Sequence, residues 1–85
     1  MTKAPKLLAK ALAKQKNLRF DELISLAESF GFEQVRVSGS HHIYHHPSVP
    51  HLLNLQPLRG KAKPYQLRQF LRIVEMYNLT LGGNG

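Results

Sequence analysis

The sequence lacks cysteine and tryptophan. Without thiols there is no disulfide framework and no thiolate metal site, and this composition is typical of a reducing compartment, so we expect a cytoplasmic location. Long apolar runs are also missing, since Leu7-Leu8-Ala9 is broken at once by Lys10. A bilayer span needs roughly 20 apolar residues. We therefore expect a soluble chain with no membrane partner.

Acidic residues are scarce, with five Asp and Glu against 12 Lys and Arg and a net charge of +7. None lies between Gln34 and Val74, so that span holds neither a catalytic carboxylate pair nor a hard-cation site built on side-chain oxygens. The same span carries five histidines and the basic residues Arg36, Arg59, Lys61, Lys63, Arg68 and Arg72. Such a positive field favours a polyanionic partner such as RNA.

With 85 residues, 42% of them hydrophobic, the chain has the size and composition of one packed domain. We expect an N-terminal basic helical extension over residues 1–18, a main domain over 19–80 and a flexible tail over 81–85. The extension should contain a helix at 5–15 that packs on the domain or binds a partner. A targeting peptide is an alternative for this acid-free start, although it is rich in Lys rather than Arg and Ser.

Two further helices follow from the apolar spacing. Residues 20–30 carry an i, i+3, i+4, i+7 stripe that ends at Gly31, formed by Phe20, Leu23, Ile24, Ala27 and Phe30. The last helix should begin at Pro64, which suits the first helical position. Its apolar face comprises Leu67, Phe70, Leu71, Val74 and Tyr77.

Three short strands should lie between these helices. Residues 33–37 and 40–46 flank the turn dipeptide Ser38-Gly39, and residues 51–56 form the third strand, while 57–63 should be a basic loop. A two-residue loop at Ser38-Gly39 would set Val37 opposite Ser40, Arg36 opposite His41 and Val35 opposite His42. His42, Tyr44 and the valines would then face the core. Arg36 and Gln34 would share the other face with His41, Ile43 and His45, giving an α+β fold with helices on one face of a three-stranded antiparallel sheet.

The five histidines allow three interpretations. A metal site is one, but a strand divides His41, His42, His45 and His46 between two faces, and no carboxylate is near to orient the imidazoles. Ordinary packed or solvated side chains are the favoured interpretation for His42, His45, His46 and His51. His41 differs because it follows a tight turn on a face without acids. An imidazole can accept and donate a proton near neutral pH, as RNA cleavage by its own 2′-hydroxyl requires. The residues alone leave that role open for His41.

The basic loop before the last helix is a candidate anion site. Lys61 and Lys63 precede a helix N-terminus, where free backbone N–H groups and the dipole favour an anion. The segment is not a P-loop, because no earlier glycine and no following Ser or Thr accompany the lysine. The alternative to anion binding is that Lys61 and Lys63 lie in an ordinary solvated loop. For Arg68 and Arg72 the alternative is the solvent-exposed side of a helix.

A helix ending in Gly31-Phe32, the run Val35-Arg36-Val37-Ser38-Gly39-Ser40-His41-His42-Ile43-Tyr44 and then His46-Pro47 resembles the HicA family of toxin mRNA interferases. The resemblance covers about residues 20–79. It implies a double-stranded-RNA-binding-domain-like fold, with the N-terminal helix as an addition. It also implies metal-independent cleavage of mRNA without a small-molecule cofactor, and neutralisation by a cognate HicB-type antitoxin.

Residue by residue, the resemblance makes His41 the catalytic histidine, with Gly39 and Ser40 as the turn that presents it. Lys61 and Lys63 correspond in kind to the family's basic residues ahead of the last helix. We expect Arg36, Ser40, Lys61, Lys63 and Arg68 to bind RNA phosphate. The chain departs from many members at its third strand, where Leu53-Asn54-Leu55-Gln56-Pro57 replaces a proline followed closely by histidine.

The leading hypothesis is therefore the toxin of a toxin–antitoxin pair, an endoribonuclease with His41 as general acid and base. The alternative is a non-catalytic RNA-binding module of the same fold, which would read the A-form backbone through its basic surface. Both predict salt-sensitive RNA binding, so only cleavage separates them. If the antitoxin covers the basic surface, its own contact surface should be acidic.

Overall fold

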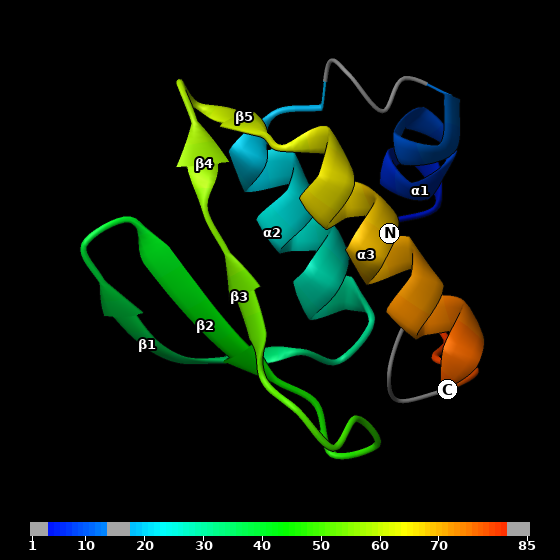
Figure 1. Cartoon of the computed structure of the whole chain (residues 1–85). Coiled ribbons are helices and arrows are strands. Elements are labelled where there is room, and N and C mark those ends of the chain that lie inside the picture. Colours follow the sequence, from blue (N-terminus) through cyan, green and yellow to red (C-terminus); the bar gives the residue numbers. More distant parts are fainter. Residues whose placement is uncertain (1–3, 14–17, 82–85) are drawn as a thin grey trace.

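The computed structural model describes residues 4–13 and 18–81. Three helices and a three-stranded antiparallel sheet in the order β1-β2-β3 form two layers, with the helices on one face of the sheet (Figure 1). A second, two-stranded sheet pairs β4 with β5. In chain order the elements are α1 (Ala4–Ala13), α2 (Phe20–Ser29), β1 (Glu33–Ser38), β2 (His41–His45), β3 (Leu53–Leu55), β4 (Pro57–Leu58), β5 (Lys61–Ala62) and α3 (Pro64–Met76).

Helix α2 begins at the predicted residue and ends at Ser29, one residue before the predicted end. At its start the Glu22 side chain accepts a hydrogen bond from the backbone N–H of Arg19 at 3.0 Å, which satisfies a free donor of the first turn. At its end Gly31 takes a positive φ of 97°, which glycine adopts without the strain of a side chain. The buried stripe is rotated slightly from the prediction, because Leu26 is fully buried and Ile24 only partly.

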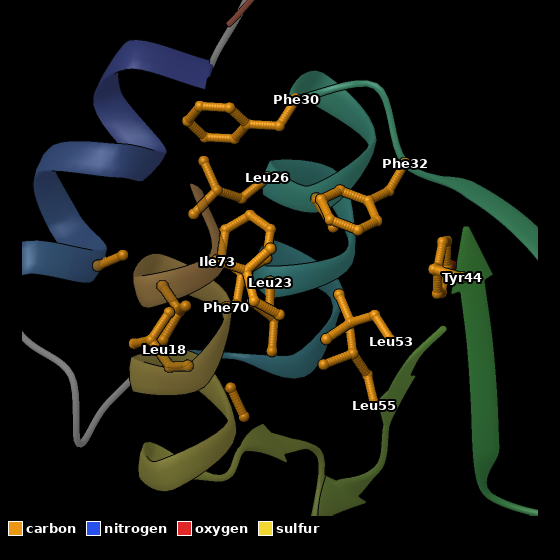
Figure 2. Close-up of a cluster of buried hydrophobic side chains, with 14 of the residues drawn as sticks. Leu18, Leu23, Leu26, Phe30, Phe32, Tyr44, Leu53, Leu55, Phe70 and Ile73 are labelled. Atoms are coloured by element: carbon orange, nitrogen blue, oxygen red, sulfur yellow. The ribbon is translucent and has the colours of Figure 1, made fainter. Parts of the chain in front are cut away.

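The core lies between the helices and the inner side of β2 and β3. Figure 2 shows Phe30 and Phe32 on one side of Phe70, with ring centroids 5.7 Å from it in each case. The largest fully buried side chains are Tyr44, Phe70, Leu18, Leu23, Leu26, Leu55 and Leu67. One continuous core therefore joins α2 and α3 to the two inner strands.

The N-terminal helix is part of the packed structure. Ala11 is fully buried in the core, and Leu8 packs against it. The ammonium of Lys10 donates to both carboxylate oxygens of Glu22, at 2.8 and 3.0 Å, which ties α1 to the start of α2. No helix in residues 4–13 or 18–81 is long and apolar enough to cross a membrane. Of the predicted tail over 81–85, Leu81 packs against the core and residues 82–85 lie outside the described range.

The pairing of β1 with β2 differs from the predicted register by two residues. The loop is Gly39-Ser40 rather than Ser38-Gly39, so Ser38 faces His41, Val37 faces His42 and Arg36 faces Ile43. The predicted partners were therefore wrong. A shift of two residues keeps Arg36, Val37 and His41 on their predicted faces, because side chains alternate along a strand. His41 thus remains on the face opposite to His42.

A bulge at Val35 overturns a further expectation, the face on which Gln34 lies. The register jumps between Gln34 and Arg36, which places Gln34 opposite Tyr44 on the helix-covered face instead of beside His41. There the Tyr44 hydroxyl donates to the Gln34 amide oxygen at 3.3 Å. Burial raises the pKa of Tyr44, with a smaller contribution from the negative charge of Glu28. The bulge thus supplies an acceptor for a buried phenol that stays protonated.

Contrary to the prediction, neither valine of β1 is buried in the core. Val35 and Val37 are 55% and 47% exposed, although the neighbouring strand buries Tyr44 almost completely. Figure 1 shows the reason, since β1 is the outer strand and projects beyond the edge of the helical layer. The pattern placed Val37 on the face of His42, as the pairing shows, but it could not show that the helices do not reach this outer strand.

Residues 57–63 form a small hairpin instead of the predicted loop. Its two-residue turn is Arg59-Gly60, with φ values of 54° and 79°, the pair of positive values that a type I′ turn requires. Backbone bonds fix this hairpin to the start of α2: the Phe20 N–H donates to the Gly60 carbonyl and the Ala62 N–H to the Leu18 carbonyl, each at 2.9 Å. The segment before α3 is thus held on both sides.

We expect the Lys10–Glu22 ion pair to contribute about 0.5–1 kcal/mol at neutral pH, the size of a solvent-screened pair. The Lys10 ammonium and the Arg19 N–H lower the pKa of Glu22 from its ordinary value of 4.5. The stabilisation is therefore full above that value and is lost as the pH falls through the lowered pKa of the folded state. Urea unfolding of the wild type and Glu22→Gln should differ at pH 7 and converge in acid. Glu28→Gln, an exposed change on the same helix, should be nearly neutral.

Candidate functional site

His41 begins β2 directly after the Gly39-Ser40 turn, and its side chain is exposed. The turn requires a positive φ of 61° at Gly39, where a Cβ would meet no atom within 4 Å. Glycine is therefore favoured here for its backbone conformation rather than for space. His42 and Tyr44 point toward the helices, so His41 belongs to the opposite side of the sheet, which we call the outer face.

The outer face carries a polar group from each strand. Arg36 on β1 and Asn54 on β3 both pair with Ile43, so both lie diagonally from His41. The side-chain nitrogen of Asn54 is 3.2 Å from Nδ1 of His41. Because an amide can turn to present its oxygen instead, the Asn54 oxygen can accept from Nδ1–H, and the lone pair of Nε2 is then the one that accepts a proton. This contact orients the ring and leaves Nε2 without a hydrogen-bond partner among the described residues.

A second set of contacts connects the turn with the start of α3. The Gln56 side-chain nitrogen donates to Oγ of Ser40 at 3.3 Å, and the Lys63 ammonium donates to the Gln56 amide oxygen at 3.4 Å. Ser40 is the chain neighbour of His41. The structure thus connects the Lys63 ammonium, through one amide, to the residue beside the histidine.

The buried side chain of Gln66 fixes the strand end that carries Asn54 and Gln56. It is 6% exposed, and apart from Tyr44 no other residue of the described part of the chain with a polar side-chain group is buried. Its amide oxygen accepts the Gln56 backbone N–H at 3.0 Å, and its amide nitrogen donates to the Asn54 backbone carbonyl at 3.4 Å. Helix α3 therefore sets the position of both amides that contact the His41 turn.

A family model described as the HicA toxin of bacterial toxin–antitoxin matches residues 20–76, about two thirds of the chain. The chain belongs to the HicA family. No curated protein and no solved structure matches it. Membership makes the chain the toxin of a toxin–antitoxin system, and it confirms the predicted α+β, double-stranded-RNA-binding-domain-like fold with an additional N-terminal helix. Helix α1 precedes the part that the HicA model matches.

Some of the residues predicted to bind RNA lie apart from this cluster. Lys61 is exposed on β5 opposite Leu58. Arg68 lies on α3, in a groove of about 500 Å³ that also contains Leu8 and Leu12 of α1. Because α1 and the sheet lie on opposite sides of the α2–α3 pair (Figure 1), Arg68 is not brought to the histidine of this HicA chain. Arg36, Ser40 and Lys63 are the predicted residues that the fold gathers around His41.

The remaining histidines are held in several ways. His42 packs edge-on against Phe20, with centroids 4.9 Å apart. His46 is fixed through both ring nitrogens: Nδ1 accepts the Ser48 N–H at 2.9 Å, and Nε2 lies 3.0 Å from the Phe30 carbonyl oxygen. As predicted, the strand divides the cluster between its faces. Within residues 4–13 and 18–81, no three His, Cys, Asp or Glu side chains are grouped to hold a metal ion.

Sequence reasoning overlooked Asn54, Gln56 and Gln66. Leu53 and Leu55 alternate with Asn54 and Gln56, so the pattern placed two amides on the face opposite to the core. That signal was available, because the same alternation puts His41 on that face. No pattern marks Gln66, whose role depends on the tertiary contact between α3 and β3.

Proposed function

We propose that this HicA-family toxin is an endoribonuclease that cleaves mRNA, with His41 as general acid and base. The observation that supports this most directly is the His41 side chain itself. Its ring contacts Asn54 through Nδ1, the residue is exposed, and Arg36 lies diagonally from it on the neighbouring strand. A fixed imidazole with one exposed nitrogen is suited to move a proton at a substrate.

The reaction follows from RNA's own nucleophile. His41 accepts the proton of the 2′-hydroxyl while the 2′-oxygen forms a bond to the adjacent phosphorus. The bond from phosphorus to the 5′-oxygen breaks, and that oxygen takes a proton from a water molecule to which the His41 imidazolium returns one. The products are a 2′,3′-cyclic phosphate and a 5′-hydroxyl end. Arg36 and Lys63 stabilise the negative charge that grows on the phosphoryl oxygens.

Neither the reaction nor the charge stabilisation calls for a metal, because imidazole, ammonium and guanidinium groups provide both. The partner of the toxin is an antitoxin, which we propose to be of the HicB type. An acidic surface on that antitoxin would compete with RNA for the same cations.

The proposal is tested by incubating the purified chain with a structured mRNA fragment in excess EDTA. We expect cleavage with cyclic-phosphate ends, and none of the same RNA when every 2′-hydroxyl is methylated. Expression should also arrest growth, and co-expression of a cognate HicB-type antitoxin should relieve the arrest. RNA that is bound with salt-dependent affinity but never cut would instead establish a non-catalytic RNA-binding module.

A further inference from the structure

The orientation of the Gln56 amide is fixed by its neighbours. An ammonium can only donate, so the amide oxygen must face Lys63 and the amide nitrogen must face Ser40. The amide nitrogen carries two hydrogens, and the contact with Ser40 uses one of them. The second hydrogen has no acceptor among the described residues and lies beside the turn that carries His41.

Lys63 is a half-buried cation that no carboxylate of the described residues neutralises. Its ammonium contacts the neutral Gln56 oxygen at 3.4 Å, a long hydrogen bond. All five acidic side chains lie within the described residues, and those in ion pairs, Asp21 and Glu22, bind Arg19 and Lys10. The Lys63 ammonium is therefore available to an anion, and Gln56 keeps it directed toward Ser40.

The backbone beneath these groups is held by a buried hydrogen-bond partner. Gln66 holds the Gln56 N–H at 3.0 Å from a buried position, and no buried side-chain nitrogen or oxygen among the described residues lacks a partner. A donor mounted on a fixed backbone loses little entropy when it binds a ligand. The strand end is thus preorganised.

We propose that Gln56 and Lys63 form a phosphate-binding subsite for RNA next to His41. The free amide N–H of Gln56 and the Lys63 ammonium donate to non-bridging oxygens of one phosphate. A phosphate fits better than a base, because both groups only donate toward the open side and one is a cation without a counterion. The inference rests on the proposed function for its substrate, and it adds Gln56 to the residues that contact RNA.

Replacing Gln56 with glutamate tests the subsite. The carboxylate neutralises Lys63, removes the amide donor and repels phosphate, so we expect cleavage to fall about 100-fold or more. Gln69→Glu is the matched control: it introduces the same charge at an exposed position of α3, and we expect its cleavage to stay within about twofold of wild type. Gln56→Ala, which adds no charge, should lose about tenfold, and it decides the matter if circular dichroism shows that Gln56→Glu is unfolded.

The affinity for 2′-O-methyl RNA, which cannot be cleaved, is a second measurement of the subsite. Lys63→Gln should reduce the slope of log Kd against log salt by about 0.7, the value for one phosphate contact on a single strand. Gln56→Glu should weaken binding about tenfold, while Gln69→Glu should leave it within about twofold.

The cleavage rate and the affinity for methylated RNA together distinguish an error in the proposed subsite from an error in the proposed function. If the wild type cleaves and Gln56→Glu cleaves as well as Gln69→Glu, the subsite is wrong and the nuclease stands. If the wild type does not cleave but Gln56→Glu alone loses affinity for the methylated RNA, the subsite stands and the nuclease is wrong. Equal affinity of both variants for that RNA, without cleavage, overturns both.

Discussion

Replacing His41 with alanine is expected to leave a folded chain that no longer cleaves RNA. The side chain is exposed and its polar contact is the one with Asn54, so the free energy of unfolding should change by less than about 0.5–1 kcal/mol. Loss of a positioned general acid–base lowers the cleavage rate by about 10²–10⁴-fold. Single-turnover cleavage in EDTA measures the rate, and urea unfolding checks the fold.

His45→Ala is the control for this experiment. His45 is exposed on the same strand and the same outer face, but it lies at the other end, opposite Glu33. It should retain nearly full cleavage, because no amide orients it and a carboxylate is its neighbour. Equal rates for the His41 and His45 variants, or growth arrest by His41→Ala at wild-type strength, would refute the catalytic role of His41.

The sequence was sufficient to place His41 on the correct face, although the predicted register was wrong. Side chains alternate along a strand, so only an odd shift would have moved His41 to the face of Tyr44. The actual shift is two residues, because the turn is Gly39-Ser40. The bulge at Val35 is different in kind, since it accompanies a contact between Gln34 and the buried Tyr44 hydroxyl. That contact joins two strands and has no local signal.

The same distinction holds for the residues around His41. The turn and the alternating amides of β3 are local features, and they can be read along the chain. The links from Lys63 to Gln56 and from Gln66 to the β3 backbone join α3 to the sheet. They depend on the packing of α3 against the core. The sequence alone therefore identifies the histidine. The fold determines which cation lies near its turn, and this is Lys63, which contacts Gln56, rather than Arg68.

Replacing Phe70 with alanine should destabilise the chain far more than any of the surface substitutions. Phe70 is fully buried and contacts the rings of Phe30 and Phe32. Removing a buried phenyl ring costs about 3–5 kcal/mol, because burial is lost and a cavity remains. A domain of this size has roughly 4–13 kcal/mol in total. Urea unfolding should therefore show a large fall in the midpoint, or a chain already unfolded in water.

Phe70→Leu is the matched variant, since it keeps an apolar side chain and should cost less than about 1.5 kcal/mol. A loss below about 1 kcal/mol for Phe70→Ala would contradict the packing of α3 against the core. Phe70 also lies one helical turn after Gln66, on the buried side of α3. Because Gln66 positions Asn54 and Gln56, a shift of α3 should reach the outer face of the sheet. We therefore expect Phe70→Leu to remain folded but to cleave RNA more slowly than the wild type.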